Sequence, residues 1–205
     1  MTDSADRPFD RLVAVMDRLR RECAWTGRQT HASLARYLLE EAHETLEALH
    51  TGDSDHLRDE LGDLLLQIVF HARIAAEREG WDIDDVVRGL TDKLIRRNPH
   101  VFGDGEARTP EEIDAAWQAV KAAERPRDSV HQGIPSTLPA LAYADKILKR
   151  LGDPSVVGDD IGSRLLALVA EARAQGVDAE EALRRTVRAM GQVERENPPA
   201  ENPPA

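Results

Sequence analysis

Hydrophobic residues recur every three or four positions along most of this chain, with polar and charged residues between them. That spacing is the period of one apolar face on an amphipathic helix. The pattern predicts helices separated by short breaks over residues 9–21, 31–50, 54–79, 82–98, 110–124, 138–150, 160–175 and 178–195. The fold class that the sequence predicts is therefore all-α.

Composition supports helices and limits the classes of partner. Of the 205 residues, 41% are hydrophobic but only 4% are aromatic, which favours helices packed through Leu, Ala, Val and Ile over a β-sandwich. The net charge of -11 argues against nucleic acid as a partner, because a polyanion would be repelled. No run approaches the ~20 apolar residues of a membrane span. Because Cys23 is the only cysteine and residues 1–10 have no apolar core, we expect a cytoplasmic protein without internal disulfides.

Breaks in the pattern predict the domain organisation. A segment rich in Pro, Ser and Gly separates two helical regions and is the candidate linker. The last ten residues repeat Glu-Asn-Pro-Pro-Ala and have nothing apolar to bury. We predict a flexible N-terminus, a first helical domain, a linker, a second helical region and a disordered tail, over residues 1–8, 9–125, 126–137, 138–195 and 196–205.

The second region contains a possible internal repeat of the first. Residues 62–73 align with residues 162–173, and both segments continue to a Gly and then to an Asp that precedes an acidic pair. Ser163 stands in the place of Asp63, and no Glu-Glu-x-x-Glu lies between residues 138 and 162. The second region thus reads as a shortened copy without the acidic residues, the alternative being a chance similarity of two amphipathic helices.

Acidic residues gather on two consecutive predicted helices, each beside a leucine stripe. The first helix carries Glu40, Glu41 and Glu44, and the second carries Glu60 and Asp63. Residues three or four apart share a helix face, so each cluster places its carboxylates on one strip. Carboxylates beside a core are costly unless a cation compensates them, and oxygen ligands suit Mg²⁺ or Mn²⁺. The alternative is an ordinary solvated acidic face.

Two further features are open to two interpretations each. Lys93 and Arg97 share a face at the end of a predicted helix, where they either interact with the helix dipole or present positive charge to an anion. Trp25 lies in the break after the first helix, where it either anchors that loop or lines a pocket.

Several motifs in order then resemble a known family. They are Cys-Ala-Trp-x-x-x-Gln-Thr-His, Leu-Leu-Glu-Glu-Ala-His-Glu, Glu-Leu-Gly-Asp-Leu-Leu, Asp-Lys-Leu-Ile-Arg-Arg-Asn-Pro-His-Val-Phe and Trp-x-x-x-Lys, which begin at residues 23, 38, 60, 92 and 117. Over about residues 9–150 the sequence resembles the MazG family of all-α nucleoside triphosphate pyrophosphohydrolases, whose longer members carry two related halves. Ala24 and Thr26 depart from the residues common in the family, which are Pro and Asp.

The resemblance implies a reaction and a set of site residues. The reaction is hydrolysis of a nucleoside triphosphate to the monophosphate and pyrophosphate with Mg²⁺, for which Mn²⁺ is a possible substitute. The resemblance also implies a helical bundle completed by a homodimer or a higher homo-oligomer. The implied metal ligands are Glu40, Glu41, Glu44, Glu60 and Asp63, with Glu40 or Glu41 free to orient or deprotonate water; the implied substrate contacts are Lys93, Arg97, Trp117, Lys121 and Trp25.

Two other classes of protein stay open at this point. Glu40 and His43 form the Glu-x-x-His of di-iron carboxylate bundles, although the second acidic helix lacks the matching motif. A non-catalytic helical interaction module is the other alternative, with the acidic strip merely solvated. A house-cleaning role against damaged nucleotides, a regulatory role on normal ones and a narrow preference for dUTP or dCTP all stay open.

Overall fold

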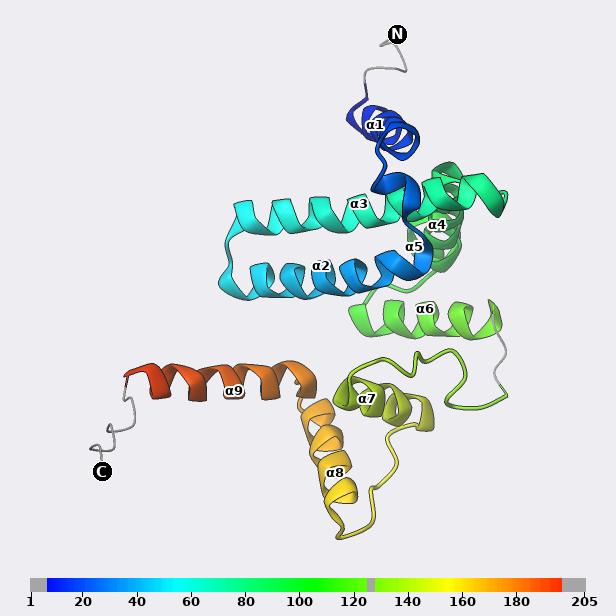
Figure 1. Cartoon of the computed structure of the whole chain (residues 1–205). Coiled ribbons are helices and arrows are strands. Elements are labelled where there is room, and N and C mark those ends of the chain that lie inside the picture. Colours follow the sequence, from blue (N-terminus) through cyan, green and yellow to red (C-terminus); the bar gives the residue numbers. More distant parts are fainter. Residues whose placement is uncertain (1–6, 125–127, 197–205) are drawn as a thin grey trace, which may run out of the picture. The chain divides into compact units, whose positions relative to one another are not determined.

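The computed structural model describes residues 7–124 and 128–196, with side chains up to Met190. Over these residues the secondary structure is helical without strands, which confirms the all-α prediction. The elements in Figure 1 are α1 (Pro8–Glu22), the 3₁₀ turn η2 (Thr26–Arg28), α2 (His31–Thr51), α3 (Ser54–Arg78), α4 (Ile83–Arg97), α5 (Pro99–Phe102), α6 (Pro110–Glu124), α7 (Ala140–Leu151), α8 (Ile161–Ala174) and α9 (Ala179–Glu196). Among the described helices, none combines the length and apolarity that a membrane crossing requires.

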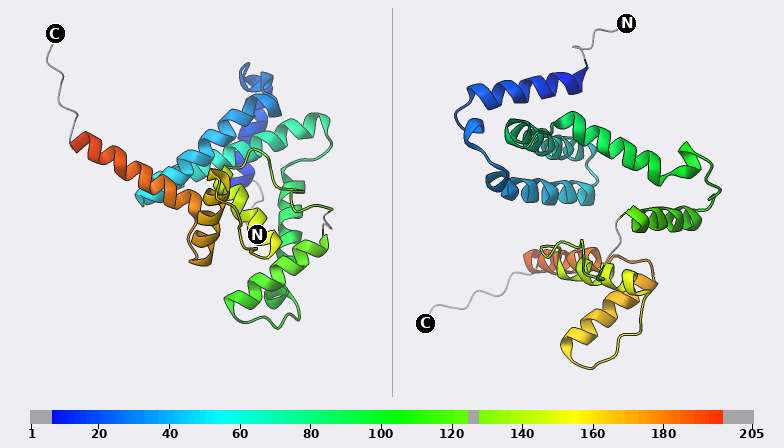
Figure 2. Two further views of the ribbon diagram at one scale, coloured as in Figure 1. Left: turned by 90° about the horizontal axis from the view of Figure 1, so that it is seen from below. Right: turned by 90° about the vertical axis from the view of Figure 1, so that its right-hand side faces the viewer.

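The chain divides between Lys121 and Ala122 into two compact units, which we call unit 1 and unit 2. Unit 1 contains α1 to α5 and most of α6, and unit 2 contains α7 to α9 (Figure 2). Of the predicted flexible N-terminus, residues 1–6 lie outside the described residues and Pro8 begins α1. Of the predicted tail, Glu196 ends α9 and residues 197–205 lie outside the described residues.

The predicted linker, residues 126–137, is described from residue 128 onward, where it belongs to unit 2 and contacts α7. The guanidinium of Arg150 on α7 donates to the backbone carbonyls of Val130 and, at 2.8 Å, Gln132. The Nδ1 atom of His131 lies 2.7 Å from the hydroxyl of Tyr143, also on α7. This part of the segment is thus attached to the helix that follows it.

Local capping chemistry determines where α2 begins and ends and where α4 begins. The Thr30 hydroxyl accepts from the backbone N–H of Ser33, whose own hydroxyl accepts from the N–H of Thr30. Gly52 ends α2 with a φ of 72°, a left-handed conformation that suits glycine. At α4, Asp82 and Asp85 form the equivalent reciprocal pair.

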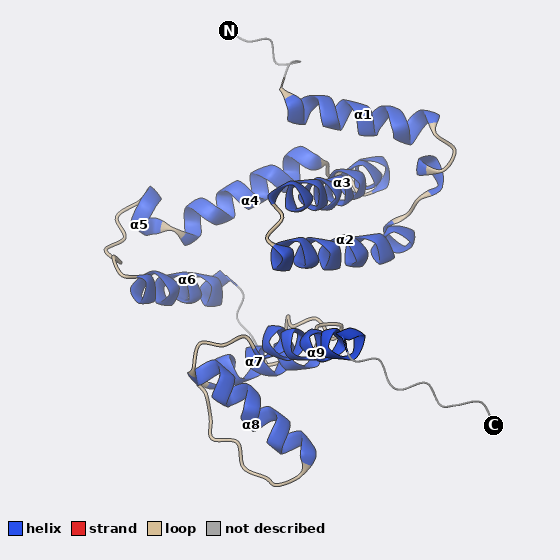
Figure 3. Ribbon diagram, turned by 90° about the vertical axis from the view of Figure 1, so that its left-hand side faces the viewer, coloured by secondary structure: helices blue, strands red, loops and turns tan. Residues whose placement is uncertain are grey.

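The core of unit 1 lies where α1 and the start of α2 pack against α3 (Figure 3). Its buried members are Met16, Leu34, Val69, Phe70, Ala72, Ile74 and Ile83. An ion pair seals one edge of this core: the nearly buried Arg20 donates to both carboxylate oxygens of Glu77, each at 2.9 Å. The same guanidinium also donates to the carbonyls of Thr26 and Gln29. Arg20 therefore ties α1, the η2 turn and the end of α3 together.

Candidate metal and nucleotide site

Three carboxylates from the antiparallel pair α2 and α3 meet on one side of unit 1. Glu41 comes from α2 and Glu60 and Asp63 come from α3, and one oxygen of each lies within 4.8 Å of the others. The turn explains this convergence. Glu41 lies eleven residues before Gly52 and Asp63 lies eleven residues after it, so both stand about 16 Å along their helices from the turn.

Glu60 is largely enclosed, with a side chain that is 14% exposed. Its Oε1 atom lies 3.1 Å from the Nε2 atom of His56, one helical turn earlier. Its Oε2 atom is buried and has no hydrogen-bond partner among the described residues. Leaving a buried carboxylate oxygen unsatisfied is costly, and a bound cation would remove that cost. The exposed Asp63 leaves the site open to solvent.

Glu41 shows the electrostatic strain of the cluster. Partial burial raises the pKa of its carboxyl, and the negative charges of Asp63, Glu44 and Glu60 raise this pKa further. A side-chain hydrogen bond with Glu44 contributes in the same direction and brings that fourth carboxylate to the cluster. A site that favours a proton on a carboxylate also favours a divalent cation, and an all-oxygen donor set fits Mg²⁺ or Mn²⁺.

The other predicted site residues lie outside this three-carboxylate group. Glu40 is exposed on α2, next to Glu41. Lys93 and Arg97 lie on α4, which starts beyond the end of α3 that is farther from the α2–α3 turn (Figure 1). Trp117 and Lys121 are four residues apart on α6, and the Arg97 guanidinium lies 5.3 Å from the centre of the Trp117 ring. The structure therefore shows two separate groups of predicted site residues. One is the acidic group on α2 and α3, and the other is Arg97 of α4 with Trp117 of α6.

Trp25 makes the contacts of a loop anchor. Its ring meets Tyr37 edge-on at 6.2 Å between centroids, and it lies 6.5 Å from Phe70 in a tilted arrangement. Half of the residue stays exposed, at 53%. The residue thus contacts α2 and α3 with one part of its ring system while another part faces solvent.

Sequence reasoning missed a pair of stacked imidazoles between α2 and α3. The rings of His31 and His71 lie 5.0 Å apart between centroids, with their Nδ1 atoms at 2.6 Å. The Nε2 atom of His31 also lies 3.0 Å from Glu79. Burial lowers the pKa of His71, and the charge of a protonated His31 lowers it further. The sequence carries no local signal for this pair, because the two residues are forty positions apart.

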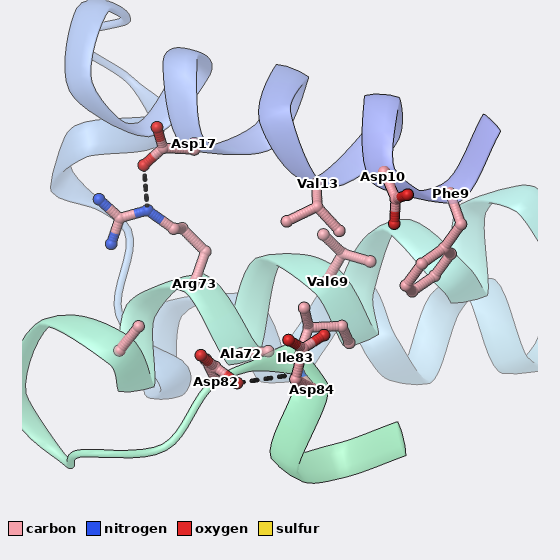
Figure 4. A pocket seen from close by; sticks show the side chains of 11 residues that line it. Phe9, Asp10, Val13, Asp17, Val69, Ala72, Arg73, Asp82, Ile83 and Asp84 are labelled. Atoms are coloured by element: carbon pink, nitrogen blue, oxygen red, sulfur yellow. Dashed lines mark hydrogen bonds and ion pairs between the residues drawn. The ribbon is translucent and has the colours of Figure 1, made fainter. Parts of the chain in front are cut away.

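A cavity of about 440 Å³ between α1, α3 and the start of α4 was also missed (Figure 4). Its walls include the apolar Phe9, Val13 and Ile83. The ion pair between Arg73 and Asp17, 2.8 Å long, lies at one end. Its α3 residues start at Val69, so it lies along α3 beyond the three carboxylates.

A helical hairpin that gathers three carboxylates, one of which has an unsatisfied buried oxygen, defines a candidate divalent-metal site. Comparisons with known proteins identify the class more closely. The MazG nucleotide pyrophosphohydrolase domain matches residues 29–102, which include α2, α3, α4 and α5. The nucleoside triphosphate pyrophosphohydrolase/pyrophosphatase MazG of Thermotoga maritima is 37% identical over 211 residues, covering 88% of this chain and 81% of that protein. The chain belongs to the MazG nucleotide pyrophosphohydrolase family.

Two other relatives show how far the similarity extends. An uncharacterised 26.1 kDa protein of Streptomyces cacaoi is 46% identical over 193 residues, which covers 88% of this chain and 80% of that protein. The nucleoside triphosphate pyrophosphohydrolase of Escherichia coli is 45% identical over 148 residues, covering 69% of this chain but only 56% of that protein. The similarity to the Escherichia coli protein therefore spans little more than half of its length.

Proposed function

We propose that this chain hydrolyses nucleoside triphosphates to the monophosphate and pyrophosphate, with Mg²⁺ as the metal and Mn²⁺ as a possible substitute. The observation that carries the proposal is the convergence of Glu41, Glu60 and Asp63, together with the buried and unpartnered Oε2 atom of Glu60, in a chain of the MazG family. The names of the Escherichia coli and Thermotoga maritima relatives support the same reaction.

In this proposal the acidic residues hold the metal and prepare the water. Glu41, Glu44, Glu60 and Asp63 are the ligands, and a cation among them would offset the repulsion between carboxylates that raises the pKa of Glu41. When bound, Mg²⁺ neutralises the triphosphate and lowers the pKa of water. The exposed Glu40, or Glu41 if it is not a ligand, orients or deprotonates the water that attacks the α-phosphorus.

The basic and aromatic residues of α4 and α6 receive the substrate in this proposal. Lys93 and Arg97 bind phosphate oxygens and stabilise negative charge on the leaving pyrophosphate. Trp117, beside Arg97, offers a flat apolar surface to the nucleotide, and Lys121 extends the same face by one turn. The half-exposed Trp25 is a further candidate for substrate contact.

The proposal includes a homodimer and a reducing, cytoplasmic location. Leucines at positions 38, 39, 46 and 49 are exposed along α2, the helix that carries Glu41. A second copy would remove this apolar surface from water, at about 25 cal/mol per Å² buried. The single cysteine fits a reducing compartment.

The di-iron alternative gains no support from the geometry. Such a site needs a second Glu-x-x-His on a partner helix. The metal-compatible group among the described residues consists of carboxylates alone, and His43 is exposed outside it. An interaction module without a metal site would leave the unpartnered Glu60 oxygen without an explanation.

Product analysis tests the proposal. A panel of canonical and modified nucleoside triphosphates is incubated with Mg²⁺ and wild type, Glu41→Gln or Asp59→Asn. Asp59 is the matched control, because it lies next to Glu60 on α3 but outside the cluster. Monophosphate plus pyrophosphate, retained in Asp59→Asn and reduced at least 100-fold in Glu41→Gln, is the expected result. Release of orthophosphate and the nucleoside diphosphate would overturn the proposal. Turnover that survives Glu41→Gln would also overturn it.

A further inference from the structure

Three helices of unit 2 repeat an ion pair and a cavity of unit 1 at aligned positions. On α3, Arg73 bonds to Asp17 of α1, and on α8, at the aligned position, Arg173 bonds to Asp145 of α7 at 3.0 Å. Each pair borders a cavity that also includes the capping region of the next helix, near Asp82 in unit 1 and near Asp178 in unit 2. By these contacts α7, α8 and α9 correspond to α1, α3 and α4.

Unit 2 has no helix in the place of α2. In unit 1, α3 meets α2 through Glu60 near its start and through His71 about three turns later. Positions 60, 64, 67 and 71 follow the three-or-four spacing of one helix face, so this face of α3 is the one that α2 covers. In unit 2, α8 follows α7 after a loop that contains no helix.

The corresponding face of α8 is an open groove. The aligned positions are Arg164, Ala167 and Glu171, and all three line a hollow of about 370 Å³ on α8. The rest of its lining is Ile161, Leu165 and Leu168, each at least half exposed. An apolar strip of this kind on a helix is normally covered by another helix.

The charges on this groove are self-complementary. Arg164 and Glu171 stand at equal distances from the point between Ala167 and Leu168, about 10 Å apart along the helix. A two-fold axis at that point would place Arg164 of each copy opposite Glu171 of the other, and the small Ala167 would let the helices approach closely. Among the described residues, Arg164 makes no ion pair, and Glu171 accepts a hydrogen bond from Gln175 at 3.2 Å.

We propose that the groove on α8 binds α8 of a second copy of this chain, antiparallel and about a two-fold axis beside Ala167 and Leu168. The partner helix takes the place that α2 has in unit 1. This contact uses residues of unit 2 alone, so it is separate from any dimer contact of unit 1 and does not depend on the proposed hydrolysis.

Site-directed cross-linking of the full chain tests this contact. Cys23→Ser removes the only natural cysteine, and Ala167→Cys then places one thiol beside the proposed axis. Mild oxidation should link two copies through position 167 at least tenfold faster than through Ser136→Cys, an exposed control position in unit 2. Equal cross-linking rates at positions 167 and 136 would overturn the proposal. That result would mean that α8 is covered within its own chain or that the chains associate through another surface.

Charge reversal provides the second arm of the test. Arg164→Glu or Glu171→Arg alone should slow cross-linking through position 167 about tenfold, because like charges then face each other across the axis. The double exchange should restore the original rate, which a variant that merely misfolds cannot do. A double exchange that stays as slow as the single changes would contradict the two-fold arrangement.

Discussion

Glu41→Gln should stabilise the metal-free protein while weakening its response to Mg²⁺. Two ionised carboxylates 4.8 Å apart repel by about 0.9 kcal/mol in bulk water and by about 3.5 kcal/mol at an effective dielectric constant of 20. Because Asp63 is exposed, we expect a value between these limits, so that removing the charge of Glu41 raises the free energy of unfolding by about 1–2 kcal/mol. For a chain of this size that raises the melting temperature by about 2–8 °C.

The pH dependence of this effect has a definite sign. A carboxyl whose pKa is raised in the folded state costs stability once the pH exceeds that pKa, and the cost disappears at a pH below the ordinary value of about 4.3. The difference between Glu41→Gln and wild type should therefore be full at pH 8 in EDTA and should vanish near pH 4.

Thermal unfolding with and without Mg²⁺ is the assay. At a free Mg²⁺ concentration 100 times the dissociation constant, binding to the folded state alone adds about 2.7 kcal/mol to the free energy of unfolding. Mg²⁺ should therefore raise the melting temperature of wild type above that of Glu41→Gln, which reverses the order seen in EDTA. Asp59→Asn, at the neighbouring exposed position, should follow wild type in both conditions. A Glu41→Gln protein that is no more stable in EDTA, and that gains as much from Mg²⁺ as wild type, would refute the reasoning.

Three further predictions concern the framework of unit 1. Because the folded state lowers the pKa of His71, stability should fall as the pH drops through about 6.5, and urea unfolding of His71→Gln should show a smaller loss between pH 7 and pH 5. Arg20→Met leaves the partly buried Glu77 with less compensation and should cost about 2–4 kcal/mol in the same assay, whereas a cost below 1 kcal/mol would contradict its role. Asp82→Ala removes the N-cap of α4 and should cost about 1 kcal/mol, and hydrogen exchange should locate the loss in the first turn of that helix.

The features that were predictable from the sequence are those that depend on neighbours in the chain. Thr30 and Asp82 cap helices through partners three residues away, so a short motif contains the whole interaction. The meeting of Glu41 with Glu60 and Asp63 could also be expected from the sequence, because a short break at Gly52 implies an antiparallel hairpin on which two acidic strips can meet. The short helix α5 and the η2 turn were not predicted, since neither is long enough to show a helical period.

The features that escaped prediction join residues far apart in the chain. Arg20 contacts Glu77, which lies fifty-seven positions later in the chain, and His31 contacts His71, which lies forty positions later. Nothing in either local sequence distinguishes these side chains from exposed ones. Only the packing of α1 and α2 on α3 determines that they meet. The attachment of the linker segment by Arg150 is of the same kind.

The most direct test of the central claim is to follow the oxygen of the attacking water. The reaction is run in ¹⁸O-labelled water with Mg²⁺ and a nucleoside triphosphate that the product panel shows to be cleaved, and both products are analysed by mass spectrometry. Attack on the α-phosphorus at the carboxylate site predicts one labelled oxygen in the monophosphate and none in the pyrophosphate. Label in the pyrophosphate would mean attack on the β-phosphorus and would contradict the account.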